Sequence, residues 1–189
     1  VVQVVVIPDI RGKLPFDPFE PKAPADMLWQ IEQYLLKHSP PYSQLKVKNP
    51  TYVRIRVRLS VRFREGYNPG YYQDALNKEL QQYLAPWAYD QSADIFFGGD
   101  INTSLIVNFV EERPYIDYVA GVKIFTSLDG EKFTIYEPEK TAPETVFAPD
   151  AILVSDRSHV IDQITEETFE EVFFTGINYM KIELDFQVG

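Results

Sequence analysis

The chain has 189 residues, of which 45% are apolar and 24% are charged, so it can bury the core of one ordinary domain and carry an appendage. It contains no Cys and two His, which excludes a disulfide scaffold, a thiolate metal site and a cysteine nucleophile, and disfavours a multi-His metal site. No apolar run reaches the roughly 20 residues of a membrane helix, so we expect no membrane insertion. Because the chain opens on Val1, already in a predicted strand, we expect it to be a fragment of a longer protein.

The charge is unevenly distributed along the chain. Residues 1–89 hold 12 Lys and Arg and 8 Asp and Glu, whereas residues 90–189 hold 6 and 20, and the net charge of the whole chain is −10. An acidic protein lacks the dominant basic surface that phosphate neutralisation requires, so we expect no nucleic-acid partner. A basic segment followed by an acidic one favours pairing within the chain or between subunits.

The first 50 residues predict a strand and a helix. Residues 1–7 form a β-branched run that is typical of a buried strand. A proline-rich connection follows. Apolar residues at three- and four-residue spacing then predict a helix that opens near Asp26 and ends near Ser39, before Pro40.

Residues 51–64 give the clearest pattern, a strict alternation of apolar and polar side chains. The odd positions from Val53 to Phe63 are apolar. The even positions are Arg54, Arg56, Arg58, Ser60, Arg62 and Arg64. Because successive side chains of a strand point to opposite faces, the pattern predicts one long strand with a buried face and a cationic face.

Two more helices and two more strands are predicted before residue 126. A turn at residues 66–70 leads into an amphipathic helix, and a short strand at 94–99 follows it. Asn102 or Thr103 can cap the third helix, and a strand covers residues 118–125. The inward side of the third helix is predicted to carry Leu105, Ile106, Phe109 and Val110.

The remainder of the chain is predicted to be β-rich. Asp129-Gly130 is a hairpin signal, and prolines mark residues 137–149 as a linker or long loop. Strands are expected at residues 151–155 and 159–164, and the alternation at 180–188 predicts a last strand.

The expected fold class is therefore α+β. The order β-α-β-α-β-α-β predicts a module over residues 1–126, with a mixed sheet and helices packed on it. We expect residues 127–189 to form a β-rich C-terminal extension of hairpins.

Two interpretations of the arginine pattern are open. The strand could present a solvated outer face, in part neutralised by acidic residues such as Glu183 and Asp185 on the last strand. Alternatively, it could be a docking surface, because Arg suits planar, bidentate pairing at interfaces better than Lys. We favour the interface, with these candidate residues: Arg54, Arg56, Arg58, Arg62, Arg64 and Trp87.

No pattern in the sequence predicts catalysis or a cofactor. Gly98-Gly99-Asp100 lacks the Lys and spaced glycine of a phosphate loop, and the carboxylates do not form a recognisable catalytic pair. His159 lies beside Ser158 and near Asp156, but neighbours along a strand point to opposite faces and make a triad unfavourable. We therefore expect no catalytic residues, no metal, no cofactor and no small-molecule substrate. Aromatic residues such as Trp87, together with the plentiful acidic residues, leave a carbohydrate-binding or hydrolytic module as the alternative.

The stretch from Tyr83 to Phe125 resembles the C-terminal part of baseplate J-like proteins, the wedge subunits of contractile phage tails and related bacterial contractile injection systems. The matching features are Leu84-Ala85-Pro86-Trp87, Phe97-Gly98-Gly99-Asp100-Ile101, Ser104, Asp117-Tyr118-Val119 and the lead Asn49-Pro50-Thr51-Tyr52-Val53. The resemblance covers about residues 1–126. One departure is Pro114-Tyr115-Ile116, where many relatives have a Gly-Val turn.

The resemblance implies a structural, non-enzymatic role. Such proteins form the ring of wedges around a central spike and help couple baseplate rearrangement to sheath contraction. The implied partners are other baseplate wedge subunits, and possibly a second copy of the chain. The implied location is the bacterial cytoplasm during assembly and then the baseplate of the tail or injection system.

Overall fold

The computed structural model describes residues 2–10, 17–90, 92–97, 101–136 and 147–165. Its longest strand is the central strand β3 (Thr51–Phe63), which confirms the strand predicted at 51–64. β3 pairs antiparallel with β4 (Ile116–Ser127) along one edge and parallel with β6 (Ala151–Ser155) and β7 (Val160–Gln163) along the other. The short strand β5 (Thr134–Ile135) continues the sheet beyond β4.

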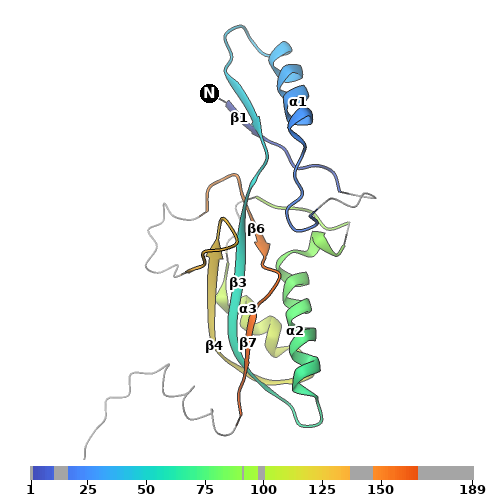
Figure 1. The fold of residues 1–189 in the computed structure, drawn as a ribbon, viewed down its shortest axis with the longest axis vertical. Coiled ribbons are helices and arrows are strands. Elements are labelled where there is room, and N and C mark those ends of the chain that lie inside the picture. The colour runs from blue at the N-terminus through green and yellow to red at the C-terminus, as the bar shows by residue number, and fades with distance from the viewer. Residues whose placement is uncertain (1, 11–16, 91, 98–100, 137–146, 166–189) are drawn as a thin grey trace, which may run out of the picture.

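Two helices cover one face of this five-stranded sheet (Figure 1). They are α2 (Pro69–Leu84), followed by the short 3-10 turn η1 (Pro86–Ala88), and α3 (Thr103–Glu111). The odd-numbered residues of β3 pack against these helices, and Val57, Leu59 and Val61 are completely buried. The alternation seen in the sequence is thus confirmed, because apolar positions at every second residue bury one face of the strand.

Asparagine side chains begin both helices, as helix N-caps commonly do. Asn68 Oδ1 accepts from the amide of Tyr71, and Asn102 Oδ1 accepts from the amide of Ser104. The expected cap at Asn102 is therefore confirmed. Leu105, expected on the inward face of α3, is instead 55% exposed, so that prediction was wrong.

A second, smaller sheet extends from one end of the molecule. It consists of β1 (Val2–Val5) and β2 (Leu45–Lys48), which pair in parallel and are connected through α1 (Ala25–Lys37). We call these three elements the arm, which projects beyond the five-stranded sheet in Figure 1. The prediction that the first strand is buried was wrong, and no residue of α1 is buried either. β2 was not predicted, because four residues beside Asn49-Pro50 do not show a resolvable period.

One more expectation differs from the structure. Residues 94–97 of the predicted strand at 94–99 are not in a strand. Among the described residues between α2 and α3 there is therefore no strand, and the mixed sheet obtains its parallel strands from later in the chain. The α+β class is confirmed.

The strands predicted at 151–155 and 159–164 are present, but they do not form a hairpin with each other. Both pair parallel with β3, so residues 151–163 share a sheet with the long strand. The hairpin predicted at Asp129-Gly130 is confirmed by the pairing of β4 with β5. The strand expected at 180–188 lies outside the described residues, and the boundary at residues 126 and 127 stays a prediction.

Candidate functional site

The arginines of β3 lie on the sheet face opposite α2 and α3, and Arg64 directly follows the strand. We call Arg54, Arg56, Arg58, Arg62 and Arg64 the arginine face. Four of them pair with carboxylates of the same chain: Arg54 with Glu20 at 2.6 Å, Arg56 with Asp156 at 2.7 Å, Arg58 with Asp162 at 3.3 Å and Arg62 with Asp117 at 3.8 Å. Arg64 Nε donates to the carbonyl oxygen of Ile116 at 2.7 Å. The face is therefore a row of internal ion pairs, with much of its positive charge neutralised.

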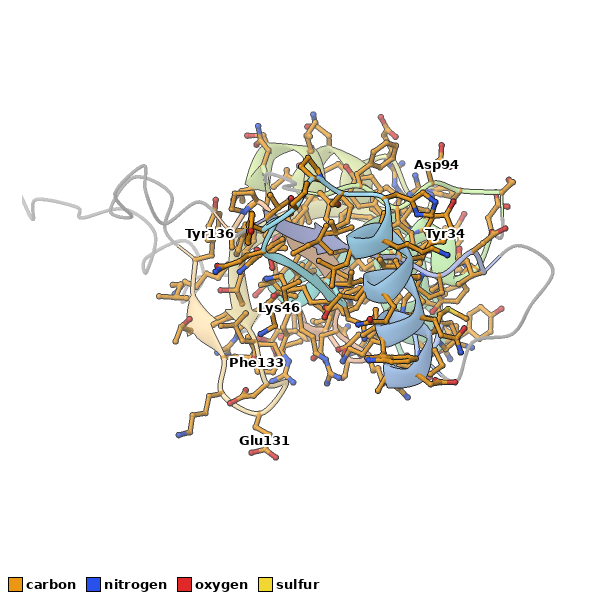
Figure 2. The ribbon with its side chains drawn as sticks, turned by 90° about the horizontal axis from the view of Figure 1, so that it is seen from above. Tyr34, Lys46, Asp94, Glu131, Phe133 and Tyr136 are labelled. Carbon is orange, nitrogen blue, oxygen red and sulfur yellow. The ribbon has the colours of Figure 1, made fainter. Side chains whose placement is uncertain are left out.

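The half of the arginine face nearest the arm is covered. Glu20, in the connection from the arm, is hydrogen-bonded to Arg54, and this hydrogen bond raises the pKa of Arg54. Arg56 lies over the ring of Phe133, with its guanidinium carbon 3.7 Å from the ring centroid. Phe133 is carried by the β4–β5 hairpin, which projects from the rest of the ribbon in Figure 2. Arg54 and Arg56 therefore hold the hairpin and the proline-rich connection against the sheet.

Gly130 allows the tip of this hairpin to approach Arg54. Its φ is +77°, and a Cβ at this position would collide with the Arg54 guanidinium. We expect Gly130→Ala to lower the free energy of unfolding by about 1–2 kcal/mol, because an L side chain is strained in this conformation. Urea unfolding monitored by circular dichroism measures the change. The control is Gly70→Ala in α2, whose Cβ would meet only Asn68 Oδ1 at 3.5 Å, and an equal loss in both variants would contradict the assignment.

The far half of the arginine face is open to solvent. The side chains of Arg58 and Asp162 are 57% and 49% exposed, and those of Arg62 and Asp117 are 41% and 51% exposed. We call these two ion pairs the exposed arginine pairs. On β4, Lys123 lies opposite Arg58 and Tyr118 lies opposite Arg62 in the antiparallel register. This part of the sheet combines charged, aromatic and hydrogen-bonding groups, which is a composition that suits a protein interface.

The sequence did not predict the carboxylates that pair with the arginines. Glu183 and Asp185, the expected partners, lie outside the described residues. Asp156 directly follows β6, and Asp162 lies within β7. Their proximity to β3 depends on parallel pairing between segments about a hundred residues apart. The carboxylate that pairs with each arginine can be identified from the sequence only after the strand order is known.

Trp87, the other candidate interface residue, is only 6% exposed. Its ring packs with Tyr52, Ala85, Ile152 and Val154 in a cluster at the β6 edge of the sheet. Its Nε1 has no hydrogen-bond partner among the described residues. A sugar-stacking platform requires an exposed ring, so the structure does not favour the carbohydrate-binding alternative at this position. The participation of Trp87 in an interface stays a prediction.

His159 and Ser155 are brought together at 3.1 Å, but their geometry is that of a structural contact. His159 Nδ1 accepts from the backbone amide of Val57 at 3.1 Å, so the proton of the neutral ring resides on Nε2. The Ser155 hydroxyl donates to the carbonyl oxygen of Asp156. Both side chains are buried, and burial lowers the pKa of His159 to about 4. An acylating serine needs His Nε2 as the proton acceptor, so this pair lacks the required tautomer.

His159 thereby fills the gap between β6 and β7 along the edge of β3. β6 ends opposite Ile55 and β7 begins opposite Arg58, so the amide of Val57 would lack a strand partner. Three amide side chains of α2 fix this connection from the helix side. Gln73 and Gln81 donate to the carbonyl oxygens of Ile161 and Arg157, and Asn77 accepts from the amide of His159. Their four-residue spacing along the helix was visible in the sequence, but the backbone groups they bind were not.

A hollow of about 670 Å³ lies where β3, β4 and β6 end near residues 147–149. Its charged lining residues are Asp129 and Lys132. The carboxylate of Asp129 accepts from the amides of Glu131 and Lys132 and from the Ser127 hydroxyl, which lowers its pKa to about 2. A carboxylate engaged in this way closes a turn and is poorly suited to general acid–base work at neutral pH.

Among the residues that the structure describes, no group of three or more His, Asp or Glu side chains is arranged to hold a metal ion. No helix in this part of the chain has the length and apolarity needed to cross a membrane.

Comparisons with known proteins give a family and a similar fold. A family model described as a PVC11-like baseplate protein matches residues 1–137. Among solved structures, a chain of the anti-feeding prophage baseplate, solved by cryo-EM with six-fold symmetry, is similar with a TM-score of 0.53 and 21% identity. The match covers 82% of this chain and 29% of that chain, so this chain spans less than a third of its length. No curated protein matches the chain.

Proposed function

Because the chain belongs to the PVC11-like family of baseplate proteins, we propose that it is a structural chain of the baseplate of a contractile injection system. The family match over residues 1–137 is the observation that carries the proposal, and it agrees with the expected baseplate component. The fold shared with a chain of the anti-feeding prophage baseplate supports it.

We further propose that the chain occupies the wedge ring and binds neighbouring baseplate chains through the exposed arginine pairs. These pairs lie on the sheet face that the helices leave open, and their side chains are about half exposed. Each guanidinium has five N–H donors, so a group that holds one carboxylate still has donors for a partner. Exposed ion pairs contribute about 0–1 kcal/mol each, so their main effect would be on register and choice of partner.

The proposed role is mechanical and needs no cofactor or small-molecule substrate. The two features that could suggest catalysis, the Ser155–His159 contact and the Asp129 carboxylate, both serve the fold. We propose assembly in the bacterial cytoplasm, followed by residence in the baseplate.

Purified contractile particles provide the test of the proposed function. A tagged chain expressed in the producing cells should be found in the particles together with sheath and tube proteins. Deleting the gene should leave tubes and sheaths without complete baseplates, and the untagged chain should restore them. Complete particles in the deletion strain would contradict the proposal.

A further inference from the structure

Within the described residues, three passages of the chain join the arm to the five-stranded sheet. The first leads from β1 to Ile10, which is buried beside Trp87 at the β6 edge of the sheet. The second leads through residues 17–23 to α1. The third leads from β2 through Asn49 and Pro50 into β3. The contacts among these passages decide whether the arm can move relative to the sheet.

No broad packing fixes the direction in which the arm projects. α1 packs against β2, and β2 pairs with β1. Among the described elements, none of these three packs extensively against the five-stranded sheet or its helices. A unit that projects without a large packed interface usually moves relative to its neighbour. The direction of the arm in Figure 1 therefore depends on the contacts between the passages.

The side chain of Asn49 connects the second passage to the third. Its Nδ2 donates to the carbonyl oxygen of Ala23 at 3.0 Å, and its Oδ1 accepts from the amide of Ala23 at 2.8 Å. Ala23 is only 4% exposed, and a buried backbone group without a partner is costly. It also carries the last amide before α1, because Pro24 has none. We call these two hydrogen bonds the junction lock.

The preceding residue, Lys48, contacts the first passage and the sheet. Its carbonyl oxygen accepts from the amide of Val6 at 3.0 Å. Its ammonium group pairs at 2.8 Å with the carboxylate of Asp150, which directly precedes β6. The same carboxylate accepts from the Thr51 hydroxyl at 3.2 Å, at the start of β3. The two consecutive residues Lys48 and Asn49 therefore contact both other passages and the edge of the sheet.

The second passage is itself fixed to the sheet. The hydroxyl of Tyr52 donates to the carbonyl oxygen of Pro21 at 2.5 Å, and both residues are buried. Glu20 pairs with Arg54 at 2.6 Å. Tyr52 and Arg54 both belong to β3. The junction lock lies two residues further along the chain from Pro21, so it connects the arm to a segment that the sheet already holds.

We propose that the junction lock makes the arm and the five-stranded sheet one rigid unit. Rotation of the arm about its three passages requires both hydrogen bonds of Asn49 to break, because they hold the start of α1 beside the end of β2. With the lock closed, a displacement of the sheet moves the tip of the arm by rigid-body rotation and is not absorbed at the junction. This mechanical property belongs to the single chain and does not depend on the partner of the exposed arginine pairs.

Distances between two spin labels test the rigidity, because the chain has no Cys of its own. Gln33→Cys in α1 and Asn108→Cys in α3 place one label on the arm and one on a helix that covers the sheet, both at exposed positions. Double electron–electron resonance on the purified full chain should give a single narrow distribution of distances. A broad distribution in this labelled chain would overturn the proposal.

Asn49→Ala in the labelled chain removes both hydrogen bonds of the junction lock. The distance distribution should become at least about twofold broader, because little other packing fixes the arm. The matched control is Asn77→Ala, which removes the hydrogen bond from another backbone amide, that of His159, to an asparagine side chain away from the junction. The control should keep the narrow distribution. Equal widths in Asn49→Ala and Asn77→Ala would overturn the proposal.

Asn49→Asp separates opening of the lock from unfolding of the arm. Its carboxylate still accepts from the amide of Ala23 but cannot donate to the carbonyl oxygen of that residue. With an unchanged circular dichroism spectrum, its distribution should be broader than that of the labelled chain and narrower than that of Asn49→Ala. This variant decides the question if Asn49→Ala loses helical signal. An unchanged width in Asn49→Asp would overturn the proposal, and this result is independent of particle assembly.

Discussion

The free energy of unfolding should fall by about 3 kcal/mol as the pH drops from about 6.5 to 4, through the protonation of His159. The folded state lowers the pKa of this residue to about 4 because burial penalises the charged ring, with Arg56 adding to the effect and Asp156 opposing it. The unfolded chain has the ordinary value of 6.5. Protons therefore bind the unfolded chain first, so this stability is fully present above pH 6.5 and is lost progressively down to pH 4.

The hydrogen bonds of the His159 ring predict the same loss of stability at low pH. In the neutral ring, Nδ1 accepts from the amide of Val57, whereas a protonated Nδ1 would place two donors against each other. His159→Asn keeps an acceptor near this position without a charge that titrates. Urea unfolding at pH 7.5, 6, 5 and 4 should give a steep decline for the natural chain and a clearly shallower one for His159→Asn. Parallel declines would show that other groups cause the acid sensitivity.

Replacing Arg56 should be far more damaging than replacing Arg58, although both lie on the same face of β3. The Asp156 side chain that pairs with Arg56 is 8% exposed, so Arg56→Ala leaves a nearly buried carboxylate without its cation. It also removes the contact with the Phe133 ring. We expect a loss of about 2–3 kcal/mol in the free energy of unfolding, less than for a fully buried pair because Arg56 is partly exposed.

Arg58→Ala is the matched control. Its partner Asp162 is 49% exposed and remains solvated when the guanidinium is removed, so the expected loss is below about 1 kcal/mol. Chemical denaturation of the two variants at pH 7.5 gives the comparison. Equal losses would mean that burial of the carboxylate does not decide the strength of these pairs.

The local periodicities predicted the central part of the fold well. The alternation at residues 51–64 requires only the geometry of a strand, and the helix start at Asn102 requires only a short-range hydrogen bond. The parallel pairing of β6 and β7 with β3 could not be predicted, because it depends on contacts about a hundred residues apart. For the same reason, the arginines were visible in the sequence but their carboxylate partners were not.

The most direct measurement concerns the exposed arginine pairs as a docking surface. Exchanging the partners of both pairs, with Arg58→Asp, Asp162→Arg, Arg62→Asp and Asp117→Arg, keeps each ion pair and the net charge but reverses the charges presented at each position. The exchanged chain should unfold within about 1 kcal/mol of the natural one, because these pairs are exposed. We predict that its amount in purified particles, measured by quantitative mass spectrometry against sheath protein, falls at least about tenfold. Incorporation at the natural level would contradict the proposed interface.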